Sequence, residues 1–458
     1  MGVDVKISNT NSQLLSFLNE VFVTSFDLLE IANNICATAN SKFAKRNIKF
    51  TSKWILINED DSGKRMTLSP VEEINYTLMY IIYSLSLEDD PVYVKFKEYI
   101  GKIEGVQSML LYYCDSSEVQ PENIIYRLMK AAFLKSEKCF DSIQLVNALN
   151  QLIANINSGV NEITLIARLH GVRLESELVE IESDISLIRL DEKAINERQP
   201  LITELRTTPT ILDYSDSNVE IKVKKQYPIS LGYNNINWRN DLSCKLENTI
   251  KSIKLYRHGK FYVDPIKFYS SLTGEISITR PAPKFTTDKV VLSNDDIEDL
   301  KKAFSIVKNI SGDNILERSF SRFLIGLNEG VPEEQIVDFV ISWESLLQTV
   351  DGNSNKAELA YRFSLNGAAI LCEIDNNREF TKTQTFMKEV YNIRSTVVHG
   401  GDSDTISKNL KKIGFDSLIN LNNEIAQLYR NTIFWLSEID KQERPYHKSF
   451  GWELLLRK

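Results

Sequence analysis

The sequence predicts an α+β protein that is mainly α-helical: a helical N-terminal region, a β-rich middle domain and a C-terminal helical bundle. The spacing of apolar residues supports this. They recur every three or four residues before about residue 155, alternate from about residue 160, and return to helical spacing after about residue 290. We therefore divide the chain into regions 1–155, 156–288 and 289–458.

Helical spacing in region 1–155 is clearest in "NQLLSFLNEVFVTSFDLLEIANNICATA" and "VEEINYTLMYIIYSLS". The polar stretches "NEDDSGK" and "CDSSEVQPEN" separate such segments. This region is expected to sense a trigger or to restrain the rest of the chain, an inference from architecture alone.

Alternating and β-branched residues mark region 156–288. The predicted strands lie in "NEITLIARLHGVRLE", "ELVEIESDISLIRL", "NVEIKVKK", "SIKLYRHGKFYVD" and "GEISITR". Gly259 stands where the middle of a hairpin turn is expected, and "TRPAPKFTTDK" is typical of a connector.

About five helices are predicted in region 289–458. They lie in "SNDDIEDLKKAFSIVKNI", "VPEEQIVDFVISWESLLQTV", "NKAELAYRFSLNGAAILCE", "TKTQTFMKEVYNIRSTVVHGG" and, beyond a polar loop, "GFDSLINLNNEIAQLYRNTIFWLSEI". Ser293 is the expected N-cap of the first helix. Short connections between helices of this length predict a compact bundle.

Composition narrows the functional classes. The chain has 458 residues, enough for two or three domains, and its formal net charge of −8 argues against a large basic surface that coats nucleic acid. Five scattered cysteines form no C-x-x-C pair or disulfide framework. No apolar stretch is long enough to span a bilayer and no secretory signal is evident, so we expect a cytoplasmic protein.

The segment "YNIRSTVVHGG", residues 391–401, ends the fourth predicted helix of the bundle. Two glycines favour a helix end directly after His399, where the imidazole could meet a substrate. His399 lies five residues after Arg394, which places the two about 140° apart around an unbroken helix. Either the helix loosens near Val398, or a complete site needs residues from a second copy of the chain.

Glu344 lies between Val340 and Leu347 on the apolar side of its helix. A carboxylate in such a place usually has a cationic partner, because burying it unpaired is costly. We expect that partner to be Arg394 or Arg362.

These residues resemble a known family. "YNIRSTVVHG" matches the aromatic-x-x-Arg-Ser-x-aliphatic-aliphatic-His-Gly signature of ApeA-like HEPN domains, and "DFVISWESLL", "AELAYRFSLNGAAIL" and "LYRNTIFWL" are similar to neighbouring helices of that group. The resemblance covers about residues 290–440, and extends more faintly to "GVRLESELVEIESDISLIRLDEKAI". Residues 1–150 resemble no family that we can name.

The resemblance implies a metal-independent endoribonuclease, often a toxin that defends against phage, whose active site forms where two HEPN domains meet. RNA supplies its own nucleophile, the 2′-OH, so the protein needs only to move protons and stabilise the phosphorane-like transition state. A histidine side chain in general has an unperturbed pKa of about 6.5, which suits a general acid or base, and we assign this role to His399. Arg394 suits binding of the scissile phosphate, and Glu344 would orient Arg394 or act as a plain structural ion-pair partner.

Three further residues have two interpretations each. Ser395 could hydrogen-bond a phosphate or cap the helix locally. Arg362 could join the site or be a solvated surface arginine. Tyr391 could stack on a base or belong to the core.

Lys408, Lys411 and Lys412 in "SKNLKKIGF" could line the RNA backbone path or form a solvated face. Asp402 and Asp404 in the same loop would oppose RNA unless they point away. We therefore expect a small basic patch rather than a long groove. The expected partners are RNA, tRNA among the candidates, a second copy of the chain and a phage-derived trigger, with no cofactor and no membrane.

Other chemistries have weaker signals. No glycine-rich phosphate loop is present, and His170, His258 and His447 lack zinc-ligand spacing, so they are expected to be surface or satisfied core residues. Glu220 and Lys222 on a predicted strand are similar to the D…E-x-K set of metal-dependent nucleases. Asp213 and Asp216 are too close in sequence to supply the neighbouring strand, and alternating Glu and Lys is ordinary surface patterning.

The rival function is a non-catalytic protein in which the HEPN bundle serves only for dimerisation or nucleotide binding in regulation. A third alternative is a bundle that modifies a partner or nucleotide. The presence of both Arg394 and His399 favours the ribonuclease, because a purely structural bundle has no need of the pair.

Overall fold

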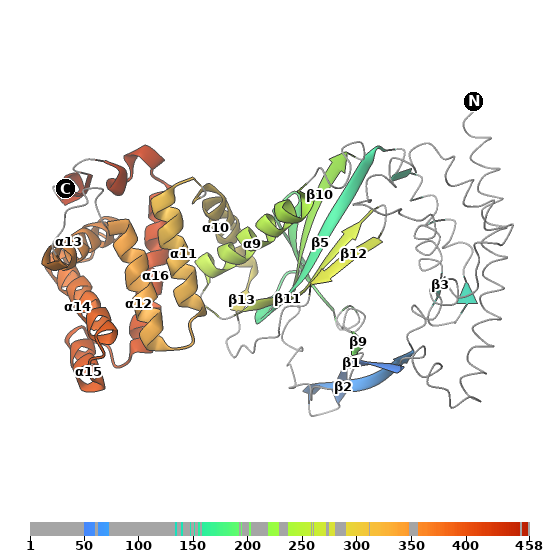
Figure 1. Ribbon diagram of the computed structural model, residues 1–458, viewed down its shortest axis with the longest axis horizontal. Helices are drawn as coiled ribbons and strands as arrows, with labels where there is room; N and C mark the ends of the chain where they lie inside the picture. Colours follow the sequence, from blue (N-terminus) through green and yellow to red (C-terminus); the bar gives the residue numbers. More distant parts are fainter. Residues whose placement is uncertain are drawn as a thin grey trace. The chain divides into compact units, whose positions relative to one another are not determined.

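The computed structural model describes residues 158–191, 219–228, 237–271, 274–279, 290–347 and 356–456, with short gaps at 258, 260, 311 and 449–450. Nearer the N-terminus it describes short strands and isolated positions. The fold is α+β, as predicted (Figure 1). It divides into two compact units, one comprising residues 1–245 and 262–285 and the other residues 246–261 and 286–458. The predicted division at residues 155 and 288 stays a prediction.

The first unit contains an antiparallel sheet of six strands in the order β12-β11-β5-β10-β8-β7. These strands are β5 (Val160–His170), β7 (Leu178–Glu182), β8 (Ile185–Arg189), β10 (Val219–Pro228), β11 (Tyr262–Ser270) and β12 (Gly274–Thr279), and β6 (Val172–Leu174) follows β5 along the chain. All of them except β11 lie mostly within segments predicted to contain a strand, whereas β11 shares only its first three residues with such a segment.

Alternation decides which face of the sheet is apolar. In β5, Ile163, Leu165 and Leu169 are fully buried, and in β10 Val223 is also fully buried. Because successive strand residues point to opposite faces, these side chains form one continuous apolar layer. Phe268 of β11 extends the layer.

Helix α9 (Trp238–Tyr256) was not predicted, and the expected strand "SIKLYRHGKFYVD" is wrong over its first residues. Ser252–Tyr256 form the last turns of α9, in which Leu242, Leu246 and Ile253 are buried at helical spacing. The short alternation of apolar residues at the end of α9 fits either a strand or a helix. The helical spacing of the apolar residues before it continues to Tyr256, and the whole segment forms one helix. Trp238, at the start of α9, packs edge-on against Phe268, with 5.3 Å between ring centroids.

Region 1–155, predicted to be mainly helical, also contains strands that the sequence did not suggest. The structure places strand β1 (Phe50–Glu59) antiparallel to β2 (Gly63–Glu72), and β9 (Leu201–Ile202) pairs with β1. Two further short strands, β3 (Phe133–Leu134) and β4 (Cys139–Phe140), pair with each other. The polar stretch "NEDDSGK" connects β1 to β2 along the chain, and the short apolar run "WILI" within "FTSKWILINE" is consistent with a strand. The longer predicted helices of this region lie outside the described residues.

The second unit is a helical bundle. Its helices are α10 (Ile297–Ile310), α11 (Asn314–Asn328), α12 (Pro332–Leu347), α13 (Lys356–Ile374), α14 (Phe380–Val398), α15 (Ser403–Lys412), α16 (Leu418–Ser437) and α17 (Gly451–Leu456), with 3-10 turns at Asn294–Asp296, Lys441–Glu443 and Pro445–His447 and the strand β13 (Val290–Leu292) before them. The five predicted helices all appear, but α14 is the fifth α-helix from α10 rather than the fourth.

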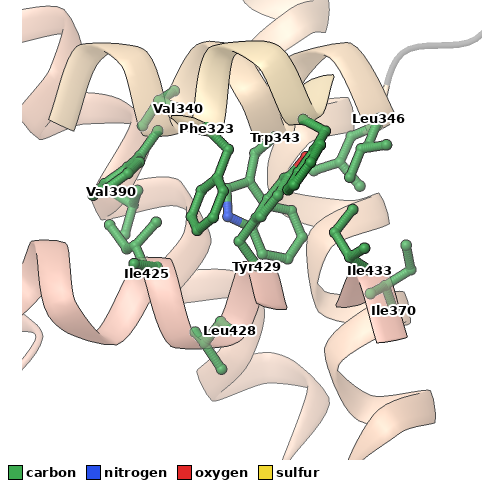
Figure 2. Packing of buried hydrophobic residues seen from close by; sticks show 14 of the residues in the cluster. Phe323, Val340, Trp343, Leu346, Ile370, Val390, Ile425, Leu428, Tyr429 and Ile433 are labelled. Atoms are coloured by element: carbon green, nitrogen blue, oxygen red, sulfur yellow. The ribbon is translucent and has the colours of Figure 1, made fainter. Parts of the chain in front are cut away.

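An aromatic cluster forms the centre of the bundle core (Figure 2). Tyr429 of α16 stacks on Phe323 of α11 at 4.3 Å between ring centroids, and Trp343 of α12 meets Tyr429 edge-on at 5.8 Å. The buried Ser319 hydroxyl lies 2.6 Å from the Tyr429 hydroxyl and donates to the Ser342 carbonyl at 2.7 Å. The tyrosine is therefore buried with its polar end satisfied, which ties α11, α12 and α16 together.

Three helices of the bundle were missed: α11, α15 and the short α17. Helix α11 buries Leu316, Phe320, Phe323 and Leu327 at helical spacing, a signal that the sequence did contain. Helix α15 replaces part of the predicted polar loop, and it buries only two side chains, those of Ile406 and Leu410.

Helix ends also follow local chemistry. Ser293, the predicted N-cap, precedes a 3-10 turn that leads into α10, and its backbone N–H and hydroxyl both donate to Asp296 at 2.7 Å. Asp402 caps α15 by accepting from the Thr405 N–H at 2.7 Å, and this hydrogen bond lowers the pKa of Asp402. In both cases an aspartate carboxylate accepts a hydrogen bond from a backbone N–H group that has no partner within the helix.

A buried carboxylate ties the C-terminal segment to the start of α11. Asp313 caps α11 through the Leu316 N–H at 3.2 Å, and its other oxygen receives Arg444 at 2.7 Å, Tyr446 at 3.1 Å and His447 at 3.1 Å. Burial raises the pKa of Asp313, but the hydrogen bonds outweigh burial and leave the pKa below its usual value. One anion thus serves helix capping and chain anchoring together.

Candidate functional site

The end of helix α14 has the hydrogen bonds of a Schellman motif. His399 is the C-cap, the Gly400 N–H donates to the Val397 carbonyl at 3.1 Å, and the Gly401 N–H donates to the Thr396 carbonyl at 2.8 Å. Gly400 has a φ of +69°, which favours glycine. The predicted helix end is confirmed.

Gly401 has a different requirement. A Cβ at this position would lie 2.3 Å from Thr396 Cγ2. Thr396 is held in place because its hydroxyl donates to the Asn392 carbonyl at 2.9 Å. The second glycine therefore permits close packing of the chain on the last turn of the helix.

The helix continues without a break through Val398, which contradicts the first of the two alternatives, a helix that loosens near that residue. His399 lies about 140° around the axis and roughly 7.5 Å along it from Arg394. His399 is exposed, whereas Arg394 is partly buried, with 23% of its side chain accessible. The two side chains therefore leave the helix in different directions.

Arg394 and Glu344 meet between α14 and α12, as one of the two expected pairings predicted. Arg394 Nη2 lies 3.9 Å from Glu344 Oε2, which is longer than a hydrogen bond, and the Glu344 side chain is 19% accessible. Arg394 Nε is buried and has no hydrogen-bond acceptor among the described residues. The ion pair therefore leaves a donor of this cation unused.

Glu344 is a desolvated carboxylate. Burial raises its pKa, and the attraction of Arg394 and a hydrogen bond from Tyr391 offset this effect only in part. The Tyr391 pKa is also raised, by burial and then by the negative charge of Glu344. The tyrosine ring packs against Phe363 of α13 at 5.3 Å between centroids, and Arg394 Cζ lies 6.0 Å from the ring centroid. The structure thus joins Glu344, Arg394 and Tyr391 in one cluster.

Other residues selected from the sequence lie on α14 itself and on α13 and α15, which both pack against α14. Arg362 is half-buried on α13 beside Phe363, and Ser395 is half-buried on α14 directly after Arg394. Lys408 and Lys411 are exposed on α15. Whether any of them binds substrate stays a prediction.

Lys412 has a structural partner that the sequence did not suggest. Its ammonium lies 3.6 Å from Glu389 Oε2 and donates to Asn409 at 3.1 Å. The Glu389 side chain is only 14% accessible, and the contact ties α15 to α14. Helical spacing could not reveal this pair, because it joins two helices.

The residues of the metal-nuclease alternative do not form the surface pattern expected for them. Glu220 is buried on β10, 4% accessible, opposite the equally buried Arg168 of β5, so the expected surface role is wrong. Asp213 and Asp216 lie outside the described residues. Within the part of the chain that the structure describes, no three His, Cys, Asp or Glu side chains form a group able to hold a metal ion.

Two of the histidines lie in satisfied environments, as expected. His170 stacks on Tyr262 at 4.7 Å between centroids, and His447 bonds to Asp313. His258 lies outside the described residues.

No family model, no curated protein and no solved structure matches this chain. The resemblance to ApeA-like HEPN domains stays a prediction. None of the helices in the described ranges is both long and apolar enough to cross a membrane.

Proposed function

We propose that this protein is a metal-independent endoribonuclease of the HEPN type, with Arg394 binding the scissile phosphate and His399 acting as general acid or base. The observation that carries the proposal is the state of Arg394. Its guanidinium is three-quarters buried next to a loosely paired carboxylate, and its Nε has no acceptor among the described residues. A cation with an unused donor suits a phosphate, whose oxygens can accept from the guanidinium fork.

His399 supplies the second requirement. As an exposed C-cap, it can approach an RNA backbone, and an imidazole can accept a proton from the 2′-OH or donate one to the departing 5′-oxygen. Stabilisation of the transition-state charge by the guanidinium completes a mechanism in which every step is a proton transfer or an electrostatic contact.

The angle between the two residues supports a site built from two chains. Within one unbroken helix, Arg394 and His399 point about 140° apart, so one chain presents them to different surroundings. A homodimer with two-fold symmetry would place the arginine of one copy near the histidine of the other. Lys408 and Lys411 on α15 would then contact the RNA backbone beside the site.

The biological role in this proposal is a cytoplasmic effector of anti-phage abortive infection, acting on tRNA or another RNA, with the N-terminal two-thirds responding to a phage-derived trigger. This part rests on the resemblance of "YNIRSTVVHG" to the ApeA-like group.

The first test is RNA cleavage in EDTA. Purified full-length protein is incubated with total RNA or tRNA, beside His399→Ala, Arg394→Ala and the exposed Arg318→Ala of α11 as a matched control. We expect cleavage by the wild type and by Arg318→Ala, and loss of cleavage in the other two. Folded wild type that leaves every RNA intact, even with a phage trigger present, would overturn the proposal in favour of a non-catalytic module.

Mixing the two inactive variants tests the two-chain site. After subunit exchange, a dimer of His399→Ala with Arg394→Ala has one site with both residues intact, so about a quarter of wild-type activity should return from random pairing. No recovery, despite demonstrated exchange, would mean that each site is built within one chain.

A further inference from the structure

Helix α15 turns back along helix α14 directly after His399. Residues 399–402 join the two helices, and α15 then packs against α14. At the other end of this hairpin, Lys412 in the last turn of α15 meets Glu389 of α14, with 3.6 Å between Nζ and Oε2. Glu389 precedes His399 by ten residues, or about 15 Å along the helix. The hairpin therefore has His399 at its turn and a charged pair at its open end.

Glu389 is a buried carboxylate with few partners. Its side chain is 14% accessible, and its Oε2 atom has no hydrogen-bond donor among the described residues. Within the same part of the chain, Lys412 is the one cation paired with this carboxylate, at a distance longer than a hydrogen bond. Removal of the ammonium would leave a buried anion unpaired, and water could reach that anion only if α15 moved away from α14.

The docking of α15 has little apolar support. The ten residues of α15 bury two side chains, those of Ile406 and Leu410. Beyond the end of α15, Phe415 packs on Phe386 of α14, with 6.2 Å between ring centroids. Hydrophobic stabilisation scales with the apolar area removed from water, so an interface this small depends strongly on its charged pair.

The position of His399 depends on this docking. Its side chain is exposed and has no hydrogen bond or ion pair to the described residues, so the backbone of the turn sets where the imidazole lies. Gly400, with a φ of +69°, and Gly401 follow directly. Because glycine permits many backbone conformations, the docking of α15 has to stiffen this turn beyond its capping hydrogen bonds. A shift of α15 would therefore move the imidazole.

We propose that Lys412 is a positioning residue: its ammonium, paired with the buried Glu389 carboxylate, holds α15 on α14 and thereby fixes the turn that presents His399 to RNA. The inference rests on the ribonuclease function proposed above. It separates Lys412 from Lys408 and Lys411, which are exposed, have no ion-pair partner among the described residues, and stay the candidates for contact with the RNA backbone.

Glu389→Gln and Lys412→Met distinguish positioning from contact with RNA. For positioning, each variant should lower kcat for RNA cleavage about ten-fold at a temperature where all the proteins are folded. The double variant should lose no more than either single one, and Lys412→Arg, which keeps the charge, should retain most of kcat. A loss in Lys412→Met without a loss in Glu389→Gln would overturn the proposal, because removing a negative charge cannot weaken a direct contact with RNA.

An exposed ion pair at the start of α14 provides the matched control. Lys382 lies 2.6 Å from Glu379, and the lysine side chain is 82% accessible. Exposed pairs contribute little to stability, so Lys382→Met should cleave RNA as the wild type does. An equal fall of kcat in Lys382→Met and Lys412→Met would refute a specific role for the buried pair.

A readout without RNA separates this inference from the proposed function. Amide hydrogen exchange of the full chain is followed by mass spectrometry over residues 399–412. Exchange should be about ten-fold faster in Glu389→Gln and Lys412→Met than in the wild type, and unchanged in Lys382→Met and Lys408→Met. Faster exchange with a wild type that cleaves no RNA would overturn the ribonuclease and support the docking role of the pair. Exchange equal to that of the wild type in every variant would refute the docking role itself.

Discussion

Gly401→Ala is expected to disturb the end of helix α14 by a steric clash. The added Cβ would lie 2.3 Å from Thr396 Cγ2 and 3.1 Å from the Thr396 carbonyl oxygen, against 3.4–4 Å for ordinary contact, so the chain must move by about 1 Å. Thr396 cannot easily yield, because it is β-branched and its hydroxyl is bonded to the Asn392 carbonyl. Overpacking of this size costs about 1–3 kcal/mol, which corresponds to a fall in Tm of roughly 5 °C for a unit of this size.

The same displacement should affect the proposed reaction. His399 lies two residues before Gly401, and a misplacement of about 1 Å in a catalytic group can reduce the rate about a hundred-fold. The assays are thermal unfolding of the full chain and RNA cleavage in EDTA. Cleavage should fall much more than the loss of folded protein at the assay temperature explains.

Three matched variants separate the clash from other effects. Thr396→Ser removes Cγ2 but keeps the hydroxyl, so it should restore most of the stability and cleavage lost in Gly401→Ala. Gly400→Ala meets no atom within 4 Å but has a φ of +69°, so it should lose about 1–2 kcal/mol through backbone strain that Thr396→Ser does not restore. Gly330→Ala, which has neither feature, should behave as the wild type.

Two results would refute this account of the helix end. One is Gly401→Ala with the unfolding temperature of the wild type, which would show that no close contact exists there. The other is an equal loss with and without Thr396→Ser, which would show that the threonine methyl is not the obstacle.

Three further predictions concern charged residues. Burial raises the folded-state pKa of Glu344, so the wild type loses stability as the pH rises through that value and the carboxyl ionises. Glu344→Gln should therefore be at least as stable as the wild type at neutral pH. In acid, where Glu344 is protonated, the variant should lose this advantage, and thermal unfolding across pH measures the difference. Asp313→Asn should lose about 3–5 kcal/mol in denaturant unfolding at neutral pH, because it leaves Arg444 buried without its anion. Since the Asp313 pKa is lowered, that difference should shrink as the pH falls through its folded-state value, and a constant difference would contradict the assignment. Lys408→Ala with Lys411→Ala should weaken RNA binding and reduce the slope of its salt dependence by about 1–2, measured by fluorescence anisotropy.

Local sequence patterns predicted much of the fold. The strands β5, β8 and β10 and five helices of the bundle follow from alternation or helical spacing, because each burial pattern lies within one segment. Where two patterns competed, the prediction was wrong: Ser252–Tyr256 look like a strand alone but belong to the longer helix α9. Helix α15 was missed because it buries only two side chains.

Burial of polar residues was harder to predict. Glu220 alternates with lysines as a surface residue would, yet it is buried opposite Arg168. Asp313 looks like an ordinary helix cap but also anchors Arg444 and His447 from the C-terminal segment. The burial of Glu220 and the second role of Asp313 both depend on residues distant in the sequence, so the spacing of residues along the chain does not predict them.

The sequence by itself determined where helix α14 ends and that His399 and Arg394 point apart, because helix geometry and the conformational freedom of glycine are local properties. It also required a cation for Glu344 without deciding which one. Only the tertiary structure selected Arg394 and left its Nε without an acceptor among the described residues. These contacts join α12 to α14 across nearly fifty residues, and the packing of the helices on a shared apolar core sets their geometry.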